Sequence, residues 1–353
     1  MKINKNAFLC MGFFIIYSTW SFYLYGTGLV GDFLVTPYDE LRFLEATNRI
    51  IMDFKAYGLI YVFENYYNYS QSVHFGHYFV LAFIRFLSND SMFFWSMYHN
   101  FIFCIGVYFF SKYLSLEYKF ISIKSIKFAS VLVFLYPVFY YLNFSLMRDI
   151  SIFSLLSIVL YLYKKNNYYL LLLFLLILSV YRVNVVLCML LYILIDQLKG
   201  KNILSIFKYI FASFAIIVFF DYIAFGIIFR NLGRINFSNF SNFINETLVL
   251  FFSPLPFSID PMLPAYLIFW FKVSFFVCIF AMCINIFVLI RSKFTLFVPV
   301  VPMIFFILLY VFIYSTEVGV GFRQASIVLP FIYIPILFYI FHLIKYKTLS
   351  IRD

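Results

Sequence analysis

Residues 146–201 read LMRDISIFSLLSIVLYLYKKNNYYLLLLFLLILSVYRVNVVLCMLLYILIDQLKGK. The stretch is largely apolar, and charged residues occur only at its start, at the lysine pair 164–165, at Arg182 and near its end. Because lysine is concentrated in the cytoplasmic loops of membrane proteins, the lysine pair predicts a cytoplasmic turn, and Arg182 predicts a turn on the opposite side. The stretch therefore predicts three consecutive helices that cross a membrane back and forth.

The rest of the chain has a similar composition. Of its 353 residues, 65% are hydrophobic and 12% are charged, whereas about half of a soluble globular domain is apolar. We therefore expect an all-α, polytopic integral membrane protein that forms a single transmembrane domain over residues 1–353. The formal net charge of +11 comes from basic residues spread through short loops, so we expect no nucleic-acid partner.

Ten spans are predicted from apolar stretches, since a crossing helix needs about 20 apolar residues. They cover residues 7–30, 92–113, 128–146, 150–163, 168–181, 183–195, 206–229, 265–290, 294–314 and 325–344. Lysines before the first span place the N-terminus in the cytoplasm, and ten spans return the C-terminus there. The main outer loops then cover about residues 31–90 and 230–264. Within the first of them, the stretch 77–87 is short and carries Arg85, so we expect it to form an interfacial helix.

Charged residues divide unequally between the two faces of this threading. Of 16 lysines, 14 fall on the cytoplasmic side, which is ordinary topology signalling. Of 15 acidic residues, 11 fall on the outer face, together with eight of the ten arginines. Because a guanidinium group binds phosphate and carboxylate oxygens in a bidentate way, the outer face is where we expect chemistry on an anionic substrate.

An acidic pair, Asp39 and Glu40, lies near the start of the first outer loop. Pro37 is typical of the beginning of a helix, and acids in the first turn suit the helix dipole. One interpretation is a capped amphipathic helix on the membrane surface. The alternative is that one carboxylate is a general base for a hydroxyl nucleophile, because nearby lipid of low dielectric constant raises a carboxyl pKa toward a useful value.

Three arginines lie at separate outer turns, each at a predicted membrane boundary. They are Arg148, Arg182 and Arg323. A single arginine at such a place is most often an interfacial anchor, and Asp149 and Glu317 are nearby partners for salt bridges. Three arginines without matching lysines favour binding of a lipid-linked phosphate or diphosphate. For His77, in the interfacial stretch, we expect a hydrogen-bonding or lipid-facing role, and contact with that phosphate is the alternative.

No cofactor and no metal site are predicted. His74 and His77 have no third ligand at a suitable spacing, and the sequence carries no indication of a divalent cation such as Mg²⁺. The five cysteines lie in apolar stretches without a CxxC motif. We expect them to be small buried hydrophobic side chains.

The layout resembles the GT-C class of polytopic glycosyltransferases, which use polyprenyl-phosphate-linked donors. The similar positions are residues 39–43, 77–87, 146–149, 182–184 and 322–324. In the first of these, Phe43 stands where that class has a tyrosine. The resemblance implies an inverting mechanism, in which Asp39 or Glu40 deprotonates the acceptor hydroxyl and the arginines hold the lipid-phosphate leaving group.

By this resemblance the chain is a hexosyltransferase of lipopolysaccharide O-antigen synthesis, acting at the periplasmic face of a bacterial inner membrane. Its partners are an undecaprenyl-linked sugar donor, a glycan acceptor, the bilayer and other polysaccharide-assembly membrane proteins. The layout also resembles the O-antigen and exopolysaccharide polymerases, in which an arginine opens a span as Arg148 does. A lipid-linked oligosaccharide flippase, or another transporter, is the third hypothesis. It is disfavoured because no internal repeat or polar track through the spans is seen.

Overall fold

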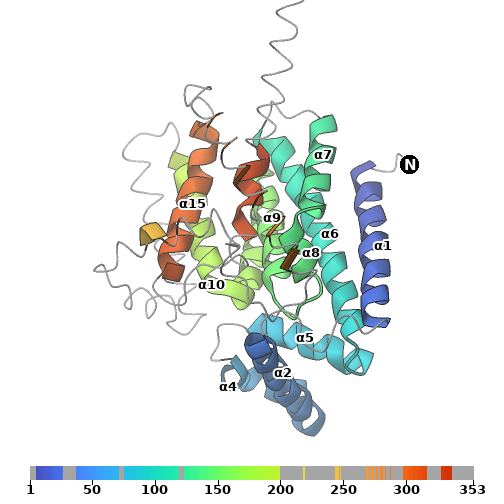
Figure 1. The fold of residues 1–353 in the computed structure, drawn as a ribbon. Helices are drawn as coiled ribbons and strands as arrows, with labels where there is room; N and C mark the ends of the chain where they lie inside the picture. Colours follow the sequence, from blue (N-terminus) through green and yellow to red (C-terminus); the bar gives the residue numbers. More distant parts are fainter. Residues whose placement is uncertain are drawn as a thin grey trace, which may run out of the picture.

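The computed structural model describes residues 5–26, 37–70, 75–118, 123–198, 297–315 and 327–335, together with scattered positions between 218 and 287. Over these residues the chain is helical and has no strand, which confirms the all-α class. The helices are α1 (Lys5–Gly26), α2 (Pro37–Tyr57), α3 (Leu59–Glu64), α4 (Tyr66–Ser70), α5 (Phe75–Ser88), α6 (Met92–Glu117), α7 (Ile123–Phe134), α8 (Pro137–Leu142), α9 (Asp149–Lys164), α10 (Tyr168–Leu198) and α15 (Phe297–Ser315). The longer helices run side by side, and α2, α4 and α5 lie at one end of the bundle (Figure 1).

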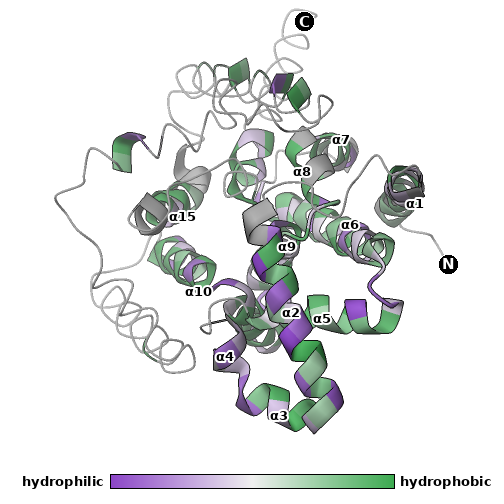
Figure 2. Ribbon diagram, turned by 60° about the horizontal axis from the view of Figure 1, so that its bottom comes forward, coloured by the Kyte–Doolittle hydropathy of each residue, from purple (hydrophilic) through white to green (hydrophobic). Residues whose placement is uncertain are grey.

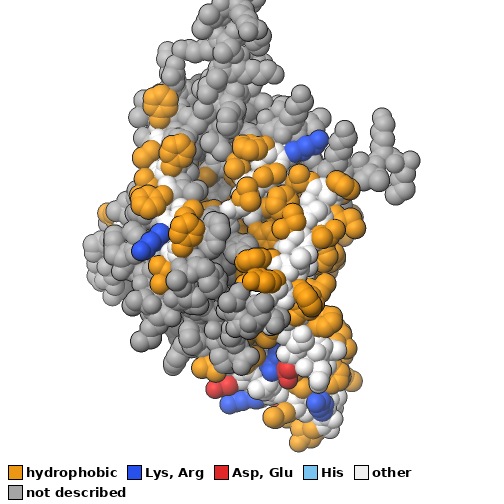
Figure 3. Space-filling view, turned by 45° about the vertical axis from the view of Figure 1, so that its right-hand side comes forward, with side chains coloured by type: hydrophobic (Ala, Val, Ile, Leu, Met, Phe, Trp, Pro, Cys, Tyr) orange, Lys and Arg blue, Asp and Glu red, His pale blue; other side chains and the backbone are white. Residues whose placement is uncertain are grey.

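Three helical segments are long and apolar enough to cross a membrane. They are Ala7–Tyr25, Met92–Glu117 and Tyr168–Leu198. Large apolar side chains are exposed along α1, among them Phe8 at 72% and Phe22 at 66%, and Figure 3 shows apolar side chains over this face of the molecule. These features support association with a membrane. The predicted spans at 206–229 and 265–290 lie largely outside the described residues.

The 31 residues of α10 do not form one straight helix. Arg182 has extended backbone angles, φ −165° and ψ 94°. It lies beside Asp149 at the start of α9, whereas Asp196 lies 2.7 Å from Lys164 at the end of α9. Since α10 begins only four residues after Lys164, a straight helix would carry Asp196 about 40 Å away from it. The two arms of α10 therefore run antiparallel, with Arg182 at the turn, as the sequence predicts for residues 168–181 and 183–195.

A partly buried ionic cluster joins the helices at what we call the Lys164 end of the bundle. The ammonium of Lys164 contacts the carboxylates of Glu117 on α6 and Asp196 on α10. Asp196 also accepts a hydrogen bond of 2.9 Å from the hydroxyl of Tyr163. Because a charge that is buried without a partner is costly, this cluster ties α6, α9 and α10 together at that end.

Helices α6 and α9 pack very closely at the centre of the bundle. Gly106 on α6 is buried, and a Cβ atom in its place would lie 2.7 Å from the Cα atom of Ser154 on α9. Small residues at such crossings allow two backbones to approach, which is how helices commonly associate in membranes. Gly106 is therefore required for this close approach of the two backbones.

We expected one span over residues 128–146, and that prediction is wrong. Helix α7 ends at Phe134, α8 covers Pro137–Leu142, and residues 143–148 are not helical. Pro137 has no backbone N–H and clashes with a preceding turn, so it interrupts a helix but fits the first turn of a new one. The interruption produces the loop 143–148, which leads into α9.

Helices α2 to α5 form a layer that covers the opposite end, which we call the Arg148 end. Helix α5 has 14 residues and rises about 21 Å, less than the roughly 30 Å of a hydrocarbon core. Helix α2 is amphipathic, with hydrophilic and hydrophobic positions interspersed along it (Figure 2). The buried Arg85 on α5 donates to Asn48 on α2 at 2.8 Å and to Asp90 at 2.7 Å. The stretch 77–87 is thus helical and packs against α2.

Candidate functional site

The loop 143–148 is buried although it is not helical. Residues from Asn143 to Met147 expose at most 4% of their surface. Buried backbone N–H and C=O groups need hydrogen-bond partners, and irregular backbone at membrane depth is found only inside protein or around a water-filled cavity. Local bonds satisfy a few of these groups, such as the N–H of Met147, which donates to Ser145 Oγ. Partners for the others come from more distant helices.

Side chains from four helices form hydrogen bonds with the backbone of this loop. Three of them donate to carbonyl oxygens near its start: Tyr25 of α1 to Phe144 O at 3.0 Å, Trp95 of α6 to Ser145 O at 3.0 Å, and Ser96 of α6 to Asn143 O at 3.3 Å. The other two bind Leu146: His77 of α5 bonds its carbonyl oxygen at 2.8 Å, and Glu40 of α2 accepts from its N–H at 3.1 Å. The loop is therefore held by tertiary contacts, which makes it a rigid base for the residues that follow it.

Glu40 and His77 hold opposite sides of a single residue, Leu146. Oε1 of Glu40 accepts the N–H of Leu146, and Nε2 of His77 donates to its carbonyl oxygen. Both side chains are essentially inaccessible, with 1% of Glu40 and 0% of His77 exposed. Glu40 and His77 thus both have a structural role that positions the loop.

The imidazole of His77 is surrounded by aromatic rings. Its ring centroid lies 5.1 Å from that of Phe43, 5.6 Å from that of Trp95 and 6.5 Å from that of Tyr181. Burial in this apolar surrounding lowers the pKa of His77 to about 4, although the contact with Leu146 and the charge of Asp149 act in the opposite direction. His77 is therefore neutral at physiological pH. Because its Nε2 carries the proton, its Nδ1 has a lone pair, and this atom has no hydrogen-bond partner among the described residues.

Two arginines meet where the loop passes into α9. Arg182, at the turn of α10, lies 3.4 Å from Oδ1 of Asp149 and is buried. Arg148 is half-buried, and its guanidinium donates to the carbonyl oxygen of Tyr181 at 3.5 Å. Tyr181 directly precedes Arg182 in the chain, so both guanidinium groups lie at the same turn of α10. The carboxylate of Asp149 lies beside Arg182 there.

The structure brings four of the six predicted site residues together. Glu40 of α2, His77 of α5 and Arg182 of α10 contact residues 146–149, which include Arg148. Arg148 in turn donates to the carbonyl oxygen of Tyr181. The side chain of Asp39 and the whole of Arg323 lie outside the described residues.

Sequence reasoning missed the contribution of α6. The indole of Trp95 bonds the loop, and the imidazole of His99 is buried with its centroid 4.3 Å from the indole. The hydroxyl of Tyr98 lies 3.5 Å from that of Tyr181. Trp95, Tyr98 and His99 have the i, i+3, i+4 spacing of one helix face. That spacing was the available signal.

Within the described ranges, no three His, Cys, Asp or Glu side chains lie close enough together to hold a metal ion. Cys10, Cys104 and Cys188 are buried as expected, whereas Cys283 is exposed. Cys278 lies outside the described residues.

Comparisons with known proteins found no match to this chain among protein-family models, curated proteins or solved structures.

Proposed function

We propose that this chain is an integral membrane glycosyltransferase that moves a sugar from an undecaprenyl-phosphate-linked donor to a glycan acceptor. The reaction would take place at the Arg148 end, which we assign to the periplasmic face of a bacterial inner membrane. One observation carries the proposal: Glu40, His77 and Arg182, which lie far apart in the sequence, meet around residues 146–149, the segment that contains Arg148. Simple interfacial anchors would have no reason to meet in this way.

The arginines suit the leaving group of such a reaction. Arg148 is half-buried and donates to the carbonyl oxygen of Tyr181, so we assign its guanidinium to the binding of a phosphate oxygen. Arg182 is buried and bound to Asp149, so we assign it a positioning role at the same turn. A planar guanidinium is the side chain best suited to a phosphate that gains charge as the bond to the sugar breaks.

The carboxylates suit the acceptor hydroxyl. In the proposed step the hydroxyl oxygen bonds to the anomeric carbon, the bond from that carbon to the phosphate oxygen breaks, and the hydroxyl proton passes to a carboxylate. Glu40 already binds Leu146 N, so we assign it to positioning the loop. Asp39, its neighbour in the first turn of α2, is then the proposed general base.

Complementation of a strain that lacks the gene tests this assignment. We expect Asp39→Asn to reduce transfer about 10²- to 10⁴-fold and Arg148→Ala to reduce it about 10²- to 10³-fold. Glu40→Gln keeps an acceptor oxygen for Leu146 N and should retain most activity. Arg49→Ala, which removes an exposed arginine from α2, is the matched control.

The surface polysaccharide of the cells, separated on a gel, distinguishes the outcomes. An intact ladder that lacks one sugar supports a transferase of single sugars. A ladder that collapses to one repeat unit assigns the same site to a polymerase. Full complementation by both Asp39→Asn and Arg148→Ala would overturn the proposal.

A further inference from the structure

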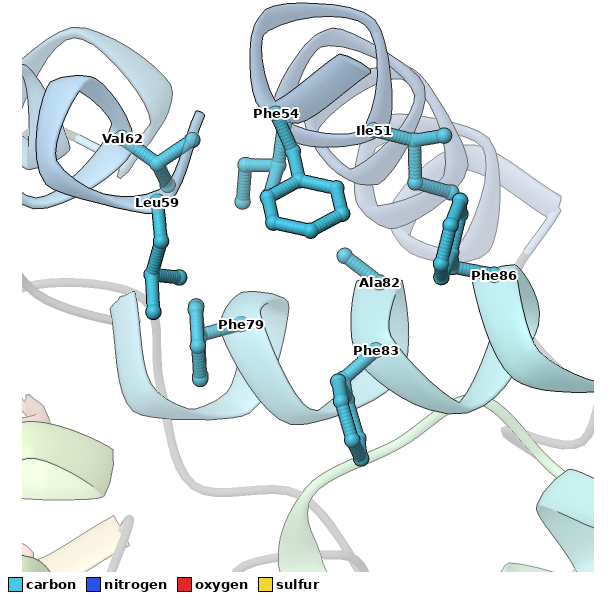
Figure 4. A pocket seen from close by; sticks show the side chains of 9 residues that line it. Ile51, Phe54, Leu59, Val62, Phe79, Ala82, Phe83 and Phe86 are labelled. Atoms are coloured by element: carbon cyan, nitrogen blue, oxygen red, sulfur yellow. The ribbon is translucent and has the colours of Figure 1, made fainter. Parts of the chain in front are cut away.

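An apolar groove lies between α2, α3 and α5, outside the contacts that hold the loop. Its volume is about 260 Å³, and the nine side chains that line it are all apolar. Figure 4 shows Phe54 of α2 above the groove, Leu59 of α3 at one side, and Phe79, Ala82 and Phe86 along α5. The groove therefore lies beside the contacts between α2 and α5, the two helices that carry Glu40 and His77.

The lining indicates the chemical class of the occupant. A ligand with a polar body would lose its hydrogen bonds to water here without gaining others, because no polar side chain lines the groove. The volume is slightly below the roughly 300–1,000 Å³ of most small-molecule sites. A flexible hydrocarbon chain is the ligand that suits such a space.

The surroundings of the groove indicate the source of this hydrocarbon chain. The layer exposes several large apolar side chains, including Met52 at 68%, Ile60 at 74% and Leu87 at 66%. Exposed apolar surface of this kind marks contact with a membrane or a partner. It is continuous with the groove, since Leu59 and Phe83 line the groove and are 47% and 54% exposed. A bilayer lipid beside this layer can therefore reach the groove.

A cation lies at the mouth of the groove. The ammonium of Lys55, in the last turn of α2, lies 5.8 Å from the ring centroid of Phe86, which is one of the lining residues. Lys55 is exposed, so it can bind an anion from the headgroup region. The nearby guanidinium of Arg85 is already bound to Asp90 and Asn48.

We propose that the groove binds one acyl chain of an anionic phospholipid whose phosphate is held by Lys55. The chain fills the space between α2 and α5, and the lipid thereby becomes part of the support for Glu40 and His77. This proposal does not rest on the sugar-transfer reaction, and lipid binding is measured without it.

The first test measures which lipid the protein retains. The full chain is reconstituted in vesicles of phosphatidylglycerol and phosphatidylcholine with identical acyl chains, and retained lipids are counted by native mass spectrometry. We expect one phosphatidylglycerol per chain. Lys55→Gln should reduce its retention about fivefold, because a lysine near an anionic lipid surface contributes about 1 kcal/mol. Lys165→Gln is the matched control, since Lys165 also lies over an aromatic ring, that of Tyr161.

The second test fills the groove. Ala82 is buried on α5 and lines the groove, so Ala82→Leu should abolish retention, whereas Ala56→Leu adds the same side chain at an exposed position of α2. In case Ala82→Leu does not fold, Phe83→Trp reports on the unfilled groove. Its added fluorescence should be quenched more by brominated phosphatidylglycerol than by brominated phosphatidylcholine. Equal quenching by the two lipids, or retention of phosphatidylglycerol by folded Ala82→Leu, would each overturn the proposal.

Discussion

The hydrogen bond from Leu146 N to Glu40 gives a prediction that separates support of the loop from catalysis. The N–H of Leu146 is buried, and Glu40 is its only acceptor among the described residues. Glu40→Ala removes that acceptor. An unsatisfied buried donor costs about 1–3 kcal/mol. Glu40→Gln keeps an acceptor oxygen at this position, so the N–H of Leu146 can retain its partner. We therefore expect the alanine variant to be the less stable of the two, with the loss concentrated in residues 143–148.

Hydrogen exchange followed by mass spectrometry measures this local loss. A cost of 1–3 kcal/mol corresponds to exchange about 5- to 150-fold faster in the peptide that contains Leu146. Peptides at the Lys164 end should exchange at an unchanged rate and serve as the internal control. Unchanged exchange in Glu40→Ala would refute the supporting role. A loss of activity in Glu40→Gln as large as that in Asp39→Asn would instead assign base catalysis to Glu40.

Three further predictions concern packing, pH and charge. Gly106→Ala should destabilise the bundle by about 1–2 kcal/mol in denaturant unfolding, because overpacking against the α9 backbone outweighs the gain in helix propensity; Gly12→Ala, which meets no atom within 4 Å, should not, and equal effects would contradict the close approach. The pKa of His77 is about 4 in the folded chain and about 6.5 when unfolded, so its unfolded form binds more protons between these values. The contribution of His77 to the free energy of unfolding is therefore complete above pH 6.5 and falls by up to about 3 kcal/mol as the pH is lowered toward 4. Denaturant unfolding at several pH values measures this, and the same pH dependence in the wild-type chain and in His77→Gln would argue against it. Asp149→Asn leaves the guanidinium of Arg182 buried without its carboxylate and should cost about 3–5 kcal/mol, whereas adding Arg182→Gln should restore part of that loss; thermal unfolding of the single and double variants measures both.

Local pattern was enough to predict part of this structure. Apolar composition indicated helices. Lysines 164–165 and Arg182 marked the two turns between three consecutive helices within residues 149–198. The antiparallel arms of α10 agree with that pattern. The short, charged stretch 77–87 was likewise recognised as a helix too short to cross a bilayer. These features depend on residues within a few turns of one another, so periodicity and charge reveal them.

The break at Pro137 shows where local pattern fails. Residues 128–146 are apolar enough to resemble a single span, and the proline is tolerated in many membrane helices. The proline either bends the helix or ends it. The outcome depends on whether other side chains can supply hydrogen bonds to the backbone groups that follow the proline. Here Tyr25, Trp95 and His77 do so from other helices, and those contacts are invisible in the local sequence.

The sequence by itself determined the helical class, the apolar surface and the residue types suited to a phosphate-bearing substrate. Only the tertiary structure decided that Glu40 and His77, which lie 106 and 69 residues away from Leu146, bind the backbone N–H and C=O of this one residue. It also decided that Arg148 and Arg182 reach one turn. The physical reason is that a buried irregular loop must find its hydrogen bonds at long range. Which distant side chains provide them follows from helix packing, and helix packing is a property of the whole chain.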